Sequence, residues 1–173
     1  SISKADFNEL GDLIPDLVQA FKNGIRDNYN DSDFKFKKLM VKNVPYLRGL
    51  NDDIILEIVF LLRSHKFDQG SKIIKRGDNV QRLYFLYEGV IEVTVPFLDS
   101  NIHFDYLNPG SCLCVFSCFD HQMQSVLDFC SKTSCIVNYI DVEELEGLGK
   151  RFMDLKDIVK AIKIELGTMG KTD

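Results

Sequence analysis

The chain has 173 residues, of which 45% are hydrophobic and 27% are charged, and its formal net charge is -5. This length and composition predict one compact domain, or one domain with a helical appendage, with enough apolar side chains for a core. The acidic balance and the lack of a basic block argue against sequence-independent nucleic-acid binding, which needs a concentrated cationic surface. No apolar run approaches the roughly 20 residues that span a bilayer, and no signal-peptide pattern is present.

The five cysteines are an odd number, and all lie between Cys112 and Cys135. Disulfide frameworks distribute paired cysteines along short secreted chains, so this clustering favours reduced thiols in a cytosolic setting. The sequence begins at Ser1 without an initiator Met. We therefore expect a soluble fragment of a larger protein, with any membrane segment lying upstream.

The first third of the sequence has the apolar periodicity of helices. Apolar residues recur at helical spacing over residues 7–25, and Pro15 suits the first turn of a second helix. Residues 28–33 are polar and turn-like, and Asp31 or Ser32 can cap the helix that follows.

Two more features complete this helical part. Pro45 predicts the end of the preceding helix and a short tight turn. A further helix is expected to begin at Asn51 or Asp52 and to run through Leu62, because its apolar residues cover a wide face.

The periodicity changes over residues 63–140, where short β-prone segments lie between glycines. Residues 83–87 and 90–95 are rich in aromatic and β-branched side chains. Glu88-Gly89 between them predicts a tight hairpin turn. Several short strands at near-regular spacing predict a barrel, sandwich or roll.

Helical periodicity returns after residue 140. Asp141, with Glu144 three residues later, forms a capping-box pattern at the start of a helix. Two helices separated near residues 147–149 are expected. The order of helices, strands and helices favours an α+β fold over alternating βαβ units.

Five motifs lie in this part of the sequence, and four of them contain a glycine at characteristic spacing. They are Phe67-Asp68-Gln69-Gly70, Ile73-Ile74-Lys75-Arg76-Gly77-Asp78, Leu83-Tyr84-Phe85-Leu86, Glu88-Gly89-Val90-Ile91-Glu92-Val93 and Leu107-Asn108-Pro109-Gly110-Ser111-Cys112. Together they resemble a cyclic-nucleotide-binding domain over about residues 34–166. The resemblance implies an antiparallel β-roll (a double-stranded β-helix or jelly roll) flanked by helices. We expect a helical linker over residues 1–42 and the roll with its C-terminal helices over residues 43–173.

The residues before the roll resemble a more specific group. Leu13-Ile14-Pro15-Asp16-Leu17, residues 39–47 and the helix at Asn51 are similar to the C-linker of cyclic-nucleotide-gated, hyperpolarisation-activated and related potassium channels. This implies a cytoplasmic regulatory domain of an ion channel, with neighbouring subunits as partners through the linker helices and the membrane reached only through an upstream segment. The alternative is a soluble sensor or scaffold of the kinase regulatory-subunit type, which binds a different ligand or a protein partner.

The sequence departs from this family in its phosphate-binding cassette. Leu113, Cys114 and Val115 stand where the family has Phe-Gly-Glu. The position of the family's arginine falls at Gln124 or Ser125, and no Arg occurs between Arg82 and Arg151.

Each of these replacements removes a contact to the nucleotide. The Val115 side chain cannot accept a hydrogen bond from a ribose hydroxyl, and Cys114 places a side chain where backbone amides approach the phosphate. The missing Arg removes a charge-assisted contact worth roughly 1.5–3 kcal/mol, which corresponds to about ten- to a hundred-fold in affinity. We therefore expect weak or no binding of cyclic AMP or cyclic GMP, and no cofactor.

Apolar residues take the place of polar ones in this segment. They are Phe116, Phe119, Val126, Leu127 and Phe129. We expect them to form a surface that packs against the protein's own helices or against a partner.

A zinc site and catalysis are the competing interpretations. Cys112, Cys114, Cys118 and His121 are soft ligands within ten residues, but their spacing is not typical of zinc sites. Core thiols are favoured, with Cys112 and Cys114 pointing the same way on one strand, and a redox-sensitive pair is a further alternative. The histidines at positions 65, 103 and 121 are scattered without a triad-like pattern, so we expect surface histidines and no enzyme.

Overall fold

The computed structural model describes residues 32–98, 100–115, 117–119 and 124–169. The helical pattern of residues 7–25, and with it Pro15, lies outside these ranges, as do Asp31, Phe116 and His121. The chain divides into two compact units, Ser1–Lys35 and Phe36–Asp173. The predicted boundary between residues 42 and 43 remains a prediction, and the description below concerns the second unit.

The helices follow the sequence pattern closely. They are α3 (Ser32–Asn43), α4 (Asp52–Leu61), α5 (Val142–Gly149) and α6 (Met153–Met169), with a short 3-10 helix η1 (Ser117–Phe119). The helix α3 ends ahead of Pro45 in tight turns, as predicted. The Asn51 side chain caps α4 by accepting a hydrogen bond from the Ile54 N–H at 3.0 Å.

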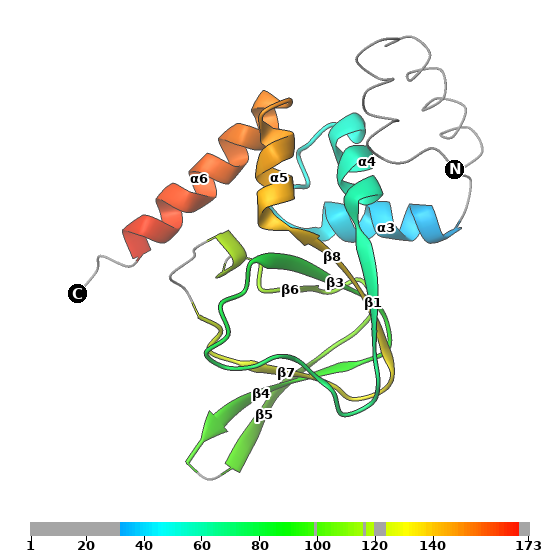
Figure 1. Cartoon of the computed structure of the whole chain (residues 1–173), viewed down its shortest axis with the longest axis vertical. Helices are drawn as coiled ribbons and strands as arrows, with labels where there is room; N and C mark the ends of the chain where they lie inside the picture. Colours follow the sequence, from blue (N-terminus) through cyan, green and yellow to red (C-terminus); the bar gives the residue numbers. More distant parts are fainter. Residues whose placement is uncertain (1–31, 99, 116, 120–123, 170–173) are drawn as a thin grey trace. The chain divides into compact units, whose positions relative to one another are not determined.

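Within the described residues, eight strands form the roll. They are β1 (Arg63–Phe67), β2 (Lys72–Ile74), β3 (Arg82–Glu88), β4 (Ile91–Phe97), β5 (Ser100–Leu107), β6 (Cys112–Leu113), β7 (Asp128–Ser131) and β8 (Cys135–Asp141). One antiparallel sheet has the order β1-β8-β3-β6 and the other has the order β2-β7-β4-β5. Figure 1 shows α4 and α5 on the side of the first sheet that faces away from the second. The predicted β-roll flanked by helices is confirmed.

The hairpin predicted at Glu88-Gly89 is wrong. Strands β3 and β4 lie in different sheets: β3 pairs with β8 and β6, whereas β4 pairs with β5 and β7. Gly89 has φ +93 and forms the corner between the sheets. The long-range pairing prevails because it buries the apolar residues of both strands inside the roll.

The capping box predicted at Asp141 is also wrong in its chemistry. The helix α5 does begin directly after Asp141, but the Asp141 side chain makes no capping hydrogen bond. Its carboxylate is instead bound by two arginines from β1 and β3. Competition from charged partners explains the difference, because the two guanidinium groups carry full positive charges whereas a backbone amide carries only a partial one.

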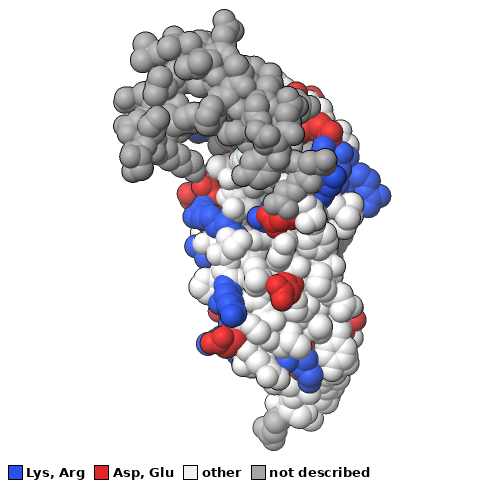
Figure 2. Space-filling view, turned by 90° about the vertical axis from the view of Figure 1, so that its right-hand side faces the viewer, with Lys and Arg blue, Asp and Glu red and all other residues white. Residues whose placement is uncertain are grey.

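The core is continuous from the roll into the helices. Its largest fully buried side chains are Phe85, Met40, Leu47, Ile54, Ile55, Ile58, Leu83, Leu86, Ile91, Leu113, Ile140 and Leu145. Within the described residues, no helix combines the length and the apolar character needed to cross a membrane. On the face shown in Figure 2, basic and acidic side chains are interspersed over the described surface.

Candidate functional site

The cassette, here residues 113–127, leaves β6 through an unusual turn. β6 ends at Leu113, and Cys114 has φ +56, in the left-handed region that favours glycine. Cys112 and Cys114 therefore do not share a strand face, contrary to the prediction. Cys114, which replaces the family's glycine, thus adopts a backbone conformation that glycine adopts readily. This conformation costs about 1–2 kcal/mol for a residue with a side chain.

The two candidate positions for the missing arginine lie at the far end of the cassette. Gln124 is exposed and forms an isolated β-bridge with Asn79. Ser125 is buried, and its hydroxyl donates a hydrogen bond to the Leu127 carbonyl at 2.8 Å. Its backbone N–H donates to the Asp78 carbonyl at 2.9 Å. The segment that precedes β3 therefore holds this end of the cassette in place.

A tyrosine that the sequence did not single out holds the other end. The Tyr46 hydroxyl, from the segment between α3 and α4, donates a hydrogen bond to the Val115 carbonyl at 2.7 Å. Its ring also packs edge-on against Phe119 of η1, with 5.6 Å between ring centroids. Burial, followed by the nearby Cys118 and Cys112, raises the pKa of Tyr46 well above its ordinary value. The hydroxyl is therefore a stable donor, and we call this contact the Tyr46 latch.

Of the three neighbouring thiols, Cys118 is buried, whereas Cys112 and Cys114 are partly buried. Burial raises the pKa of the Cys118 thiol to about 12, with Cys114 as a smaller cause, and burial also raises the pKa of Cys112. Among the described residues, which do not include His121, no group of three His, Cys, Asp or Glu side chains is placed to hold a metal ion.

The predicted apolar surface of the cassette is divided in the structure. Phe119 and Phe129 are buried, and Leu127 is partly buried. Val126, by contrast, is 68% exposed. The buried members are part of the core, so they do not form one surface with Val126.

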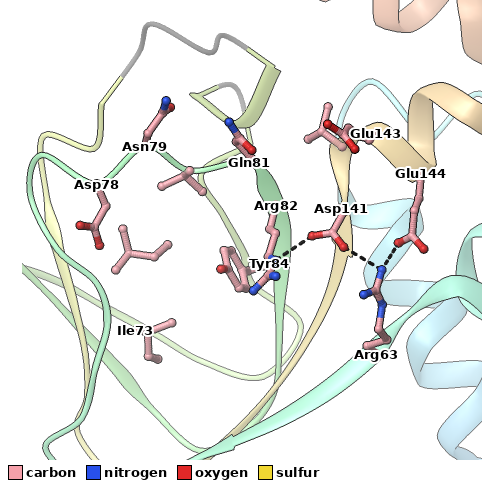
Figure 3. Close-up of a pocket in the computed structure, with 13 residues that line it drawn as sticks. Arg63, Ile73, Asp78, Asn79, Gln81, Arg82, Tyr84, Asp141, Glu143 and Glu144 are labelled. Atoms are coloured by element: carbon pink, nitrogen blue, oxygen red, sulfur yellow. Dashed lines mark hydrogen bonds and ion pairs between the residues drawn. The ribbon is translucent and has the colours of Figure 1, made fainter.

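A charged pocket lies where the segment before β3 faces β1 and the start of α5 (Figure 3). Its volume is about 700 Å³. It is lined by Arg63, Ile73, Ile74, Asp78, Asn79, Val80, Gln81, Arg82, Tyr84, Asp141, Val142, Glu143 and Glu144. Two arginines against four carboxylates leave this lining with a formal charge of -2.

One wall of the charged pocket is an ion-pair network. Asp141 accepts from Arg63 Nη2 and from Arg82 Nε, each at 2.7 Å, and Arg63 also pairs with Glu144 (Figure 3). The Arg82 guanidinium lies 4.7 Å from the ring centroid of Tyr139. Hydrogen bonding to Glu144 raises the pKa of Arg63, and hydrogen bonding to Asp141 raises that of Arg82.

This network determines which ligands the charged pocket suits. Both arginines are already matched by carboxylates of the protein, and the surplus charge is negative. A phosphate would meet repulsion and would have to compete with Asp141 and Glu144. Uncharged or cationic ligands avoid this cost. The sequence did not indicate the pocket. Arg63 lies in β1 and Arg82 lies in β3, and each of these strands pairs with β8, which is distant in the sequence.

The histidines lie at the surface where they are described. His65 and His103 are exposed, and His103 Nδ1 lies 3.4 Å from a Glu92 carboxylate oxygen. Neither belongs to a nucleophile–base arrangement among the described residues.

Comparison with known proteins gives a consistent result. The family model for the cyclic nucleotide-binding domain matches residues 64–152. The cAMP-dependent protein kinase type II regulatory subunit of Drosophila melanogaster is 24% identical over 127 residues, which are 72% of this chain and 34% of that protein. Potassium channel GORK of Arabidopsis thaliana is 34% identical over 61 residues, 35% of this chain and 7% of the channel. The chain thus spans about a third or less of the curated relatives it matches.

Solved structures share the fold. The N-terminal domain of a transcriptional regulator from Streptomyces coelicolor has a TM-score of 0.64 at 13% identity, over 76% of this chain and 92% of that one. The regulatory subunit of a cAMP-independent protein kinase A from Trypanosoma cruzi, bound to guanosine, has a TM-score of 0.59 at 22% identity. That match covers 92% of this chain and 54% of the other.

Proposed function

The chain belongs to the cyclic nucleotide-binding domain family, and on that premise we propose that it is a non-catalytic cytoplasmic regulatory domain of an ion channel. The Tyr46 latch is the observation that carries the proposal. It joins the cassette to the segment that enters the roll, so a change in the cassette has a direct route to the helices upstream. In this mechanism the position of the roll relative to residues 1–42 biases the upstream pore.

We propose that cyclic nucleotides bind weakly or not at all. No Lys or Arg occurs from Gly110 to Ser131, so the cassette has no cation for a phosphate. The charged pocket, whose lining shares no residue with the cassette, offers no alternative phosphate site because its surplus charge is negative. An unpaired phosphate beside buried apolar residues would lose its hydration without compensation.

Two observations bear on the channel assignment. The linker-like residues and the identity to a potassium channel support it. The competing class, a soluble sensor related to kinase regulatory subunits, is supported by a match that covers more of the chain. The coding sequence upstream of Ser1 separates the two, because a channel requires six hydrophobic spans and a pore loop.

A second candidate ligand follows from the charged pocket. A surplus of carboxylates in the lining suits a neutral nucleoside better than a phosphate ester, and one protein of the same fold was solved bound to guanosine. In this version the domain is a soluble sensor of nucleosides.

A thermal melt of the 173-residue chain tests these proposals, with millimolar cyclic AMP, cyclic GMP or guanosine. A ligand at a hundred times its dissociation constant adds about 2.7 kcal/mol, which raises Tm by roughly 5–10 °C for a chain of this size. We expect no shift with either cyclic nucleotide. A clear shift would contradict our interpretation of the cassette, and a shift with guanosine alone would favour the nucleoside sensor.

Variants that restore the family's residues serve as the matched control. Val115→Glu combined with Gln124→Arg, or with Ser125→Arg, returns the ribose acceptor and the phosphate cation. We expect a gain of cyclic AMP stabilisation in one of the two. Gln124 is exposed and tolerates the larger side chain, whereas Ser125 is buried.

A further inference from the structure

A second hollow lies between the two C-terminal helices, and none of its lining residues belongs to the cassette or to the charged pocket. This α5–α6 groove has a volume of about 420 Å³. It is lined by Glu146, Gly149, Lys156, Val159, Lys160, Lys163 and Ile164. Its composition therefore combines apolar side chains with three lysines.

The helical repeat of α6 explains this composition. Lys156, Lys160 and Lys163 are spaced i, i+4 and i+7, so they follow one strip of the helix over about 10 Å. Val159 borders one side of the strip and is buried. Ile164 borders the other side and is 57% exposed. The strip of ammonium groups thus lies between the two apolar side chains that line the groove from α6.

The lysine charges are largely unmatched. Lys163 pairs with Glu146, with 2.6 Å between Nζ and the carboxylate oxygen. Within the described part of the chain, Lys156 and Lys160 have no ion pair. A local surplus of positive charge on a chain with a net charge of -5 selects acidic partners.

We propose that the α5–α6 groove binds an acidic amphipathic helix of a partner protein. Apolar side chains of the partner fill the groove against Val159 and Ile164, and its carboxylates pair with Lys156 and Lys160. This is helix-in-groove recognition, in which a concave apolar surface takes the anchor residues of a partner. An anionic membrane fits less well, because membrane binding uses protruding apolar side chains, whereas the apolar surface here lines a groove.

Binding of a synthetic 14-residue helix tests the proposal. The probe carries Leu at positions i, i+3, i+4 and i+7, flanked by Glu, and a second peptide has every Glu replaced by Gln. Fluorescence anisotropy measures the affinity of each for the 173-residue chain. We expect the Glu probe to bind, with an affinity that falls as salt rises, and the Gln probe to bind at least tenfold more weakly.

Charge reversal on α6 locates the site. Lys156→Glu with Lys160→Glu should weaken the Glu probe by roughly tenfold or more, since two attractions become repulsions. The control Lys66→Glu with Lys75→Glu makes the same change in net charge at exposed positions elsewhere and should leave binding unchanged. A Lys-flanked probe should prefer the reversed variant.

Three outcomes would overturn the proposal. They are equal binding of the Glu and Gln probes, equal loss in the two double variants, and the absence of any binding by the Glu probe. Vesicles of phosphatidylserine that bind with the same dependence on Lys156 and Lys160, in a chain that ignores the peptides, would assign the strip to membranes instead. Thermal melts confirm that each variant is folded.

Discussion

At the scale of single residues, Gly89 shows how the roll constrains its corners. Its φ of +93 is costly for any residue with a side chain. A Cβ at this position would also overlap the Ser134 carbonyl oxygen and lie 2.9 Å from Cys135 Cα. Both neighbours are backbone atoms, which cannot move aside without displacing β8.

We therefore predict that Gly89→Ala lowers the free energy of unfolding by about 3 kcal/mol, from backbone strain together with steric overlap. Gly70→Ala is the matched control, because Gly70 has a similar φ of +80 but no atom within 4 Å of an added Cβ. Its loss should be about 1 kcal/mol. Urea denaturation of the two variants gives both values, and equal losses would show that the close approach to Cys135 is unimportant.

The Tyr46 latch is testable in the same way. Tyr46→Phe removes the hydroxyl and leaves the ring contact with Phe119. We expect a loss of about 1 kcal/mol in unfolding free energy, and faster amide hydrogen exchange in the cassette. Tyr106→Phe is the control, since its hydroxyl makes only an exposed contact of 3.4 Å with Glu92. Unchanged exchange in the cassette of Tyr46→Phe would argue against the coupling route.

At the scale of elements, charges connect α3 to α4. Lys38 and Lys42 of α3 each donate a hydrogen bond of 2.7 Å to the Asp52 carboxylate, in the first turn of α4. Hydrogen bonds from Lys38 and then Lys42 lower the pKa of Asp52 from 3.8 to about 2. Negative charge at a helix N-terminus is favourable in its own right.

This lowered pKa predicts a pH dependence. The contribution of Asp52 to stability is fully present above pH 3.8 and is lost as the pH falls through about 2, because protonation removes the charge. Asp52→Asn should cost less than about 1 kcal/mol at pH 7, since the pair is half-exposed, and almost nothing at pH 2. Denaturation at both pH values measures this, with Asp68→Asn as the control. A constant difference between the two pH values would contradict the assignment.

The helix α6 connects two proposed sites. It contacts η1 of the cassette on one side and carries the lysine strip of the α5–α6 groove on another.

At the scale of the whole molecule, the charged pocket joins the roll to its helices. Arg63 in β1, Arg82 in β3 and Asp141 before α5 come together in one network. The roll keeps the shape of its family, while its cassette lacks the charges that bind a phosphate. The fold is therefore retained independently of the nucleotide chemistry, which is why the function must be tested at the site.

The sequence by itself determined the features that depend on neighbouring residues or on composition. The end of α3 before Pro45 and the cap at Asn51 follow from local backbone chemistry. The absence of an arginine from the cassette can be read directly from the sequence, because no Arg occurs between Arg82 and Arg151. The family resemblance itself rested on short motifs of this kind.

Only the tertiary structure decided which distant residues meet. Strand β3 pairs with β8 rather than with its neighbour β4, and Tyr46 reaches Val115 across 69 residues. Arg63 likewise reaches Asp141 across 78 residues. A sequence pattern records which face of a strand is apolar but not which strand lies beside it. That choice depends on how all the apolar faces are buried together, and the charged pocket follows from it.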